Sequence, residues 1–221
     1  MSKRVCVAID GPAAAGKSTI SKLVAKKLGY TYIDTGAMYR AVTYYVMKKG
    51  VDPKDEAASC ALMPEIKIEL KSDGTVLCSG EDVTRVIREP SVSGNVSYIA
   101  SYKDIRLALV DQQRAMSNKV SVVMDGRDIG TYVLPHADVK IFMVASVEER
   151  AKRRYKENIE KGIACTFEEI VADVEKRDHI DSTRAFAPLK PAEDSIRLDT
   201  TPLTIDEVVA EVLRIIEEKV K

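Results

Sequence analysis

The sequence predicts an α/β fold in which helices cover both faces of a mostly parallel, five-stranded sheet. Short apolar runs alternate with longer helical patterns along the chain, and a glycine-rich turn joins the first run to the first helix. The runs are continuously apolar, which is typical of strands buried on both faces. We expect strands over Arg4–Ile9, Thr31–Ile33, Val120–Met124, Val139–Val144 and Ile196–Leu198.

The segments between these runs carry apolar residues three and four positions apart, which indicates amphipathic helices. The last helix also has a capping box, because Thr204 is followed three residues later by Glu207. Its apolar stripe is expected to pack in the core and to carry no chemistry. We expect helices over Lys17–Leu28, Ala37–Lys49, Ile105–Met116, Val147–Glu160, Phe167–Asp178 and Ile205–Lys219.

Composition is typical of a single compact domain, since 221 residues with 45% hydrophobic content can bury one sizeable core. A formal net charge of +0 provides no global field for nucleic acid or an anionic membrane, so we expect neither as a partner. The four cysteines form no C-x-x-C pair and there are two histidines, which argues against a disulfide framework or a structural zinc. Because no signal segment or membrane-length apolar run is present, we expect a cytoplasmic protein.

The turn after the first strand reads G-x-x-x-x-G-K-S, the pattern of a phosphate-binding loop. Gly11 and Gly16 let backbone N–H groups point at a phosphate, and Lys17 can reach the β- and γ-phosphates. Ser18 can ligate Mg²⁺, and the helix N-terminus adds its positive dipole. The pattern predicts a three-layer P-loop NTPase fold. We expect ATP to contact Gly11, Pro12, Ala13, Ala14, Ala15, Gly16, Lys17, Ser18 and Thr19.

A second polar turn, Asp125-Gly126-Arg127-Asp128-Ile129-Gly130, directly follows the strand expected at Val120–Met124. Ligands of parallel sheets bind at the carboxyl ends of strands, so this turn should share a crevice with the phosphate loop. Asp125 can support the hydration shell of Mg²⁺, because its carboxylate offers the oxygen atoms that this ion prefers as ligands. The planar fork of Arg127 suits a substrate phosphate. The alternative is an ordinary turn with a local ion pair.

Two groups of charged residues have helical spacing further along the chain. Taken alone, such spacing is typical of a solvated salt-bridge face. Together with a phosphate loop it indicates phosphoryl transfer, because two anionic nucleotides brought together need cations around them. The first group is Arg150, Arg153 and Arg154, followed by a polar segment suited to a flap; the second is Arg177, Asp181 and Arg184.

One segment of the sequence departs from the alternation of apolar strands and amphipathic helices. Glu65–Lys71 alternates charged and apolar residues, Ser72-Asp73-Gly74 offers a turn, and Thr75–Cys78 returns. This pattern predicts a half-exposed β-hairpin inserted into the α/β domain. The hairpin could be a surface decoration or could cover a substrate.

Four motifs in this order resemble those of the bacterial cytidylate kinases, a family of the nucleoside monophosphate kinase group, over essentially the whole chain. The family usually has Ser where Thr35 stands, and Thr keeps the hydroxyl. The motifs are Ile9-Asp10-Gly11-Pro12 before the phosphate loop, Asp34-Thr35-Gly36-Ala37-Met38-Tyr39-Arg40, the segment from Asp125 to Thr131, and the segment from Arg177 to Leu189.

The resemblance implies transfer of the γ-phosphate of ATP to CMP or dCMP by a monomer that uses Mg²⁺. It also implies one domain over residues 1–221, with a core at 1–62, 100–150 and 163–221. A small β-containing monophosphate-binding insert would occupy about 63–99, and a short helical lid about 151–162.

The resemblance further implies roles for single residues. Lys17, Arg127, Arg150, Arg153, Arg154 and Arg184 would be catalytic, the three arginines at 150, 153 and 154 belonging to the lid. Thr35, Tyr39 and Arg40 would line the monophosphate pocket, while Ser97, Arg106 and Asp128 would approach the base. Arg127 and Arg184 would hold the acceptor phosphate, and Arg177 and Asp181 would hold the ribose. The segment Asp199–Leu203 would lie beside the adenine, and Asp125 would belong to both the substrate site and the metal site.

Such a reaction needs no catalytic base, because a phosphate monoester has a second pKa of about 6 and is mostly dianionic at neutral pH. The protein has to align the reactants, neutralise charge and exclude water. Asp128 accepting a hydrogen bond and Arg106 donating one would complement the edge of cytosine, which carries a donor beside two acceptors.

Three other functions are open at this point. A GTPase switch would need an N-K-x-D guanine reader, and the nearest string, Asn118-Lys119-Val120-Ser121, lacks the Asp. A regulatory nucleotide-binding module would leave Arg127 and the second charged group unexplained. A monophosphate kinase acting on AMP, or on UMP and CMP alike, is the nearest alternative.

Overall fold

The structure is a computed structural model that describes residues 4–220. The chain divides into two compact units, one holding Met1–Tyr32 and Val120–Lys221 and the other holding Ile33–Lys119. Each unit is described by itself below. Within residues 4–220, no helix has both the length and the apolar character that crossing a bilayer requires.

The first unit is built on a five-stranded sheet of order β2-β6-β1-β7-β8. β1 pairs in parallel with β6 and β7, and β7 pairs in parallel with β8, so the predicted α/β fold is confirmed. β1 and β6 begin later than their apolar runs, because the ladder starts where Cys6 meets Val122. The strands are β1 (Cys6–Asp10), β2 (Thr31–Asp34), β6 (Val122–Gly126), β7 (Val139–Val144) and β8 (Ile196–Asp199).

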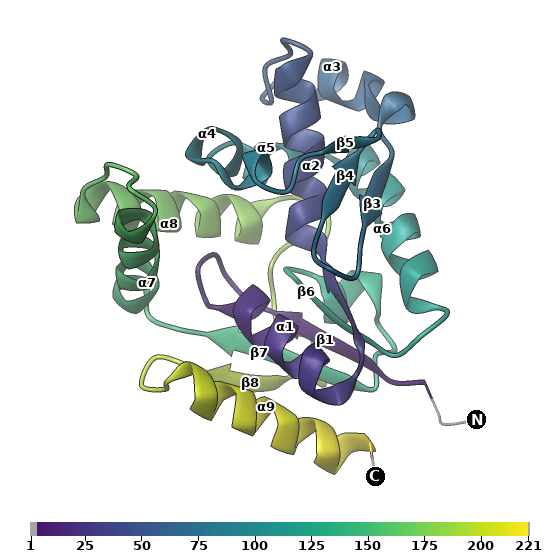
Figure 1. Cartoon of the computed structure of the whole chain (residues 1–221), viewed down its shortest axis with the longest axis vertical. Helices are drawn as coiled ribbons and strands as arrows, with labels where there is room; N and C mark the ends of the chain where they lie inside the picture. Colours follow the sequence, from purple (N-terminus) through teal and green to yellow (C-terminus); the bar gives the residue numbers. More distant parts are fainter. Residues whose placement is uncertain (1–3, 221) are drawn as a thin grey trace. The chain divides into compact units, whose positions relative to one another are not determined.

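Helices α1 and α9 pack against one face of this sheet and against each other (Figure 1). The capping box of α9 is present, since the Glu207 N–H donates to Thr204 Oγ1 at 3.3 Å and the Thr204 N–H donates to Glu207 Oε2 at 2.8 Å. α8 continues beyond the end expected from the sequence. The helices of this unit are α1 (Lys17–Leu28), α7 (Val147–Glu160), α8 (Phe167–Thr183), α9 (Ile205–Val220) and the π-helix η3 (Ile129–Val133), which was not predicted.

Every residue of β1 and β6 is buried, which agrees with strands covered on both faces. The register pairs Asp10 with Gly126, so the two strands end side by side. The glycine-rich turn and the turn that contains Arg127 therefore begin at the same edge of the sheet. This edge is where ligands bind in parallel α/β sheets.

The second unit packs helices against a small antiparallel sheet of order β3-β4-β5. The short helices were not predicted because a single turn shows no apolar period; α3, for example, begins at its local cap Asp55. The elements are α2 (Thr35–Lys48), α3 (Glu56–Ala61), η1 (Met63–Glu65), β3 (Ile68–Leu70), β4 (Val76–Cys78), β5 (Glu81–Asp82), η2 (Val86–Arg88), α4 (Pro90–Ser93), α5 (Val96–Ile99) and α6 (Lys103–Ser117).

The inserted hairpin is present as β3 and β4, with Ile68 opposite Cys78. Val76 and Cys78 are buried and join the apolar core that α2 and α6 share. The hairpin therefore holds its unit together and is more than a surface decoration. The third strand, β5, escaped prediction because its two residues are charged and exposed. The proposed insert and lid boundaries, 63–99 and 151–162, stay predictions.

The apolar stripe of α9 generates a stability test. Ile216 is buried in the core, whereas Ile205 on the same helix is 55% exposed. Ile216→Ala should lower the free energy of unfolding by about 2–5 kcal/mol, because it removes buried methyl groups and leaves a cavity. Ile205→Ala should change it by less than about 0.5 kcal/mol. Urea unfolding of both variants checks this, and equal losses would contradict the assigned packing.

Candidate active site

The glycine-rich turn after β1 can adopt its shape only with glycine at Gly11. A Cβ atom there would lie 2.1 Å from the carbonyl oxygen of Met143. Gly16 and Ala14 also have positive φ values, of 85° and 57°. Backbone that alternates between right-handed and left-handed conformations turns successive N–H groups toward one point, which forms an anion-binding nest.

Lys17 is buried inside this turn. Its Nζ donates to the carbonyl oxygen of Pro12 at 2.7 Å. Burial, reinforced by the nearby positive charge of Arg127, lowers the pKa of Lys17 to about 7. An amine that loses charge for these reasons regains it when an anion enters, so Lys17 is poised to receive a phosphate.

Two hydroxyl groups hold the Asp125 carboxylate at the end of β6. Ser18 Oγ donates to Asp125 Oδ2 at 2.9 Å, and the Tyr32 hydroxyl donates to Asp125 Oδ1 at 2.8 Å. A hydroxyl beside a carboxylate is a donor set suited to Mg²⁺, which proteins bind through a few oxygen ligands together with substrate phosphates. The predicted pair Ser18 and Asp125 therefore fits this ion chemically.

Arg127, which is partly buried, forms an ion pair with the buried Asp181, 2.8 Å between Nε and Oδ2. Burial alone would lower the pKa of Arg127, but the Asp181 carboxylate outweighs it and raises that pKa above the usual value. Burial would likewise raise the pKa of Asp181, and the charge of Arg127 lowers it instead. Both groups thus stay charged at neutral pH.

Arg184 follows α8 as its C-cap and is also buried. It donates from Nε and Nη2 to the carbonyl oxygen of Ala187, at 2.8 and 2.6 Å, and lies 3.5 Å from Asp128. For Asp181 and Arg184, a solvated salt-bridge face is therefore the wrong interpretation. Both side chains point into the protein with Arg127 and Asp128.

The positive charge of Arg177 is only weakly balanced by neighbouring carboxylates. Its Nε is buried and has no hydrogen-bond partner, and its nearest carboxylate, Asp173, lies 3.9 Å from Nη1. Burial, followed by the charge of Arg127, lowers the pKa of Arg177 to about 10. An anion would relieve this repulsion, so the arrangement favours a phosphate-bearing ligand.

Arg150 lies on α7 with the other two arginines, and its side chain reaches the glycine-rich turn. Its buried guanidinium donates from Nη1 to the carbonyl oxygen of Ala13 at 3.0 Å, and its Nη2 lies 2.6 Å from Asp178 Oδ2. Asp178 also accepts the Ala13 N–H at 3.3 Å. Arg150 and Asp178 together therefore hold the backbone of Ala13 in the glycine-rich turn on both its N–H and its carbonyl side.

The other two arginines of α7 contact different partners. Arg153 donates to the side chain and the carbonyl oxygen of Thr200, at 3.2 and 2.7 Å, and pairs with Glu149. Arg154 pairs with Glu157 at 3.2 Å. Arg153 thus ties α7 to the segment expected beside adenine, and Arg154 forms an ion pair within its own helix.

The second unit brings together another cationic group around Asp34. This carboxylate caps α2 by accepting the Ala37 N–H at 2.7 Å, and lies 3.2 Å from Arg40 and 3.4 Å from Arg88. Arg40 Nε is buried without a hydrogen-bond partner. The predicted residue Thr35 is buried at the start of α2.

Arg106 of α6 is 1% exposed and lies over the Tyr39 ring, 5.2 Å from its centroid. Its Nη1 donates to the carbonyl oxygen of Ala100 at 2.8 Å. The predicted residue Ser97 is buried in the neighbouring helix α5. A buried arginine stacked on an aromatic ring is oriented in advance for a polar ligand.

Sequence reasoning missed several residues that organise these sites: Asp10, Tyr32, Asp34, Arg88 and Asp178. A signal existed for Asp10 and Asp34, because each is a charged residue at the carboxyl end of a predicted strand. The partners of Tyr32, Arg88 and Asp178 come from distant segments, so no local pattern could identify them.

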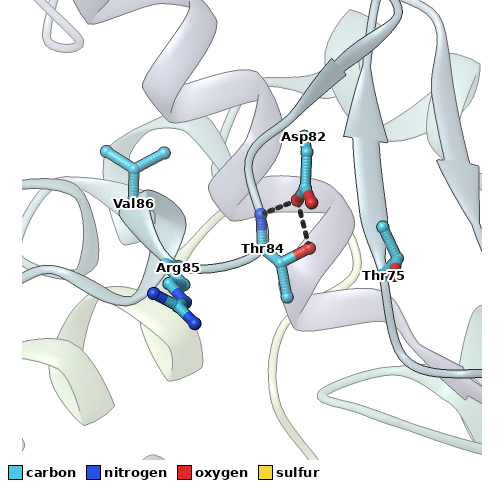
Figure 2. A pocket seen from close by; sticks show the side chains of 5 residues that line it. All are labelled: Thr75, Asp82, Thr84, Arg85 and Val86. Atoms are coloured by element: carbon cyan, nitrogen blue, oxygen red, sulfur yellow. Dashed lines mark hydrogen bonds between the residues drawn. The ribbon is translucent and has the colours of Figure 1, made fainter.

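A cavity of about 440 Å³ lies beside the small sheet of the second unit. Figure 2 shows the turn in its wall, where Asp82 accepts hydrogen bonds from the N–H and the hydroxyl of Thr84. Its lining holds none of the predicted site residues: Thr75, Asp82, Thr84, Arg85 and Val86. Arg85 supplies the cationic group of this lining.

The sequence pattern of one known family, described as cytidylate kinase, matches residues 7–218 of this chain. The chain belongs to the cytidylate kinase family. It is 53% identical over 223 residues to a cytidylate kinase from Bacillus licheniformis, covering 99% of both chains. It is 56% identical over 216 residues to one from Lactiplantibacillus plantarum, covering 96% of this chain and 95% of the relative.

Solved structures support the fold of this cytidylate kinase family member. An uncharacterized protein from Eubacterium ventriosum superposes with a TM-score of 0.57 at 13% identity, covering 98% of this chain and 99% of the other. A gluconokinase from Sinorhizobium meliloti gives a TM-score of 0.53 at 13% identity, covering 98% and 94%. At such identities the likeness concerns the fold alone.

The lowered pKa of Lys17 predicts proton uptake on nucleotide binding. With a pKa of about 7, this amine is mostly neutral at pH 8, and bound phosphates should raise the pKa and charge it. Binding of ADP should therefore take up close to about one proton at pH 8, where the terminal phosphate of ADP is already ionised. Calorimetry in buffers of different ionisation enthalpy measures the uptake.

The matched control is Lys17→Arg, which keeps the positive charge but stays protonated at every pH used. This variant should bind ADP without proton uptake at pH 8. Equal uptake in the two proteins, or none in the wild type, would contradict a neutral Lys17 in the free enzyme.

Proposed function

We propose that this chain transfers the γ-phosphate of ATP to CMP, giving CDP and ADP, as the name of its family indicates. The observation that carries the proposal is the group of buried and partly buried cations in the first unit, Lys17, Arg127 and Arg177. Lys17 and Arg177 both lie close enough to Arg127 for its charge to lower their pKa values. Such a concentration of positive charge suits two phosphate-bearing substrates.

The donor would bind at the glycine-rich turn. The backbone of residues 11–16 supplies N–H groups, and Lys17 supplies a charge for the β- and γ-phosphates. Arg150 and Asp178 hold the N–H and the carbonyl oxygen of Ala13, which keeps the turn in shape before the nucleotide arrives. Preorganised donors need little rearrangement at the moment of transfer.

Ser18 and Asp125 are the residues proposed to hold Mg²⁺, with Asp125 acting directly or through water. When bound, Mg²⁺ would neutralise charge on the β- and γ-phosphate oxygens. The chain's own contribution is to keep both oxygen ligands oriented, which Tyr32 supports through its hydrogen bond to Asp125.

The acceptor would be bound by residues expected from the family. In the first unit Arg127 and Arg184 would hold its phosphate, Arg177 and Asp181 its ribose, and Asp128 its base. In the second unit the proposed partners are Thr35, Tyr39, Arg40, Ser97 and Arg106. Arg153 and Arg154 would close over ATP from α7, and Arg150 would act through the turn that it holds.

Transfer would proceed without a catalytic base. The acceptor phosphate is mostly dianionic at neutral pH, because its second pKa is about 6. The cations orient its oxygen toward the γ-phosphorus and neutralise charge on the transferred group. Use of dCMP and a monomeric state belong to the same proposal, and the cytoplasmic location stays a prediction.

Activity with four acceptors tests the proposal most directly. The purified protein is incubated with MgATP and CMP, dCMP, UMP or AMP, and ADP release and CDP formation are followed. CMP should be the preferred acceptor, with CDP as product. Binding of ATP and CMP without CDP formation would instead identify a regulatory module, and preference for AMP would identify another monophosphate kinase.

Removing the Lys17 amine should abolish most transfer while the fold persists. Lys17→Ala should lower kcat/KM at least about 100-fold, the usual effect of losing one charge-stabilising donor. Lys26→Ala, on the exposed face of the same helix α1, should leave kcat/KM unchanged. Circular dichroism checks folding of both variants, and near-normal turnover of Lys17→Ala would overturn the role of this lysine.

Base choice should favour CMP over UMP by about 5- to 150-fold in kcat/KM. Uracil presents O4 where cytosine presents an amino donor, so a carboxylate at Asp128 would lose a hydrogen bond, at a cost of about 1–3 kcal/mol. The coupled ADP-release assay compares the two acceptors at one ATP concentration. Equal efficiency with UMP would show that Asp128 does not read the base.

A further inference from the structure

Asp10, the last residue of β1, makes two hydrogen bonds across the first unit. Its Oδ1 accepts the Ile129 N–H at 2.8 Å, and its Oδ2 accepts the Gly130 N–H at 2.7 Å. These are the first two residues of the π-helix η3. Because the first N–H groups of a helix have no partner within it, both would be unsatisfied without Asp10.

No residue nearer in sequence performs this capping. Asp128 occupies the N-cap position of η3, but its side chain makes no capping hydrogen bond. Its carbonyl oxygen instead closes the helix by accepting the N–H groups of Tyr132 and Val133, at 2.8 and 3.1 Å. The backbone of Asp128 is therefore held by η3, whose first two N–H groups are in turn held by Asp10.

Packing around these bonds leaves little freedom. Asp10 is 5% exposed, so water cannot readily replace it. A Cβ atom on Gly130 would lie 3.3 Å from Asp10 Oδ2 and 3.2 Å from the side chain of Lys140. The close approach of Gly130 is what brings its N–H within reach of the carboxylate.

The position of Asp10 in the chain places these hydrogen bonds between the two polar turns. Asp10 directly precedes Gly11, the first residue of the glycine-rich turn, while Ile129 and Gly130 directly follow Arg127 and Asp128. One carboxylate thus joins the turn proposed to hold the donor to the turn proposed to hold the acceptor. Its charge also acts on Lys17.

We propose that Asp10 is a positioning residue for phosphoryl transfer, which caps η3 from the neighbouring strand and thereby fixes Arg127 and Asp128 relative to the glycine-rich turn. The inference rests on the proposed function. Asp10 does not touch the substrates, and it acts through the backbone of residues 127–130. A misplacement of about 1 Å in such a residue can cost about 100-fold in rate.

Asp10→Asn tests this with little change in size. Asparagine offers one acceptor and one N–H₂ group to two N–H donors, so one hydrogen bond is lost and two donors face each other. We expect kcat to fall about 10- to 100-fold and KM for CMP to rise, because Arg127 moves. KM for ATP should stay within about 3-fold, since the glycine-rich turn keeps its own contacts.

The matched control is Asp138→Asn. Asp138 accepts the Cys6 N–H at 2.9 Å, so this carboxylate also binds backbone, at the other end of β1. This variant should lose stability without the change in kcat. If Asp10→Asn alters only the melting temperature, with kcat and KM for CMP within about 3-fold of the wild type, the positioning role is overturned.

A double-mutant cycle with Arg127→Ala separates positioning from general destabilisation. If Asp10 acts through Arg127, adding Asp10→Asn to Arg127→Ala should lower kcat/KM by clearly less than it does in the wild type. Fully additive losses would reject the coupling. If Asp10→Asn does not fold, Gly130→Ala is the second test, because its added methyl group crowds the Asp10 carboxylate. This variant should also lower kcat and raise KM for CMP. Unchanged kinetics in Gly130→Ala would then overturn the proposal.

Failure of this inference and failure of the proposed function give different results. A wild-type protein that forms no CDP ends the proposed function. A wild-type protein that forms CDP, with Asp10→Asn kinetics equal to those of Asp138→Asn, ends only the role assigned to Asp10.

Discussion

Burial of several positive charges at the carboxyl edge of one sheet is the constraint on which the rest of the first unit depends. Lys17 and Arg177 both have lowered pKa values because water is excluded and Arg127 is near. Such an arrangement costs free energy unless acids or ligand anions balance it. The parallel strands make the arrangement possible, because they bring the ends of β1 and β6 together.

Carboxylates supply this balance, and each has a distinct task. Asp181 pairs with Arg127, Asp125 is bound by two hydroxyl groups, and Asp178 pairs with Arg150 while accepting a turn N–H. Burial raises the pKa of Asp10 to about 7, although two backbone N–H groups and Lys17 favour its charged form. These carboxylates thus orient the cations and the backbone, and the cations stay available to bind phosphates.

The glycine-rich turn shows how a local motif depends on its surroundings. Gly11 is required because Met143 of β7 approaches its Cα, and the turn is held from outside by Arg150 and Asp178. The motif in the sequence therefore specifies the capacity to bind phosphate. The neighbouring elements decide whether the turn has its binding shape before the nucleotide arrives.

The sequence alone determined the order of the five sheet strands and the long helices along the chain, the phosphate loop and the family. These rest on local patterns: continuous apolar runs for strands buried on both faces, a capping box for α9, and the glycine spacing after β1. It did not predict β5, η3 or the short helices of the second unit, since such short segments have no distinctive period.

Only the tertiary structure decided which charged residues pair. Helical spacing did not reveal that the Arg150 guanidinium is buried against Ala13 and Asp178. Asp10 meets Ile129, and Arg127 meets Asp181, across long stretches of chain. The physical reason is that side-chain pairing depends on distance and burial after packing, whereas sequence patterns report only the conformation of neighbouring residues.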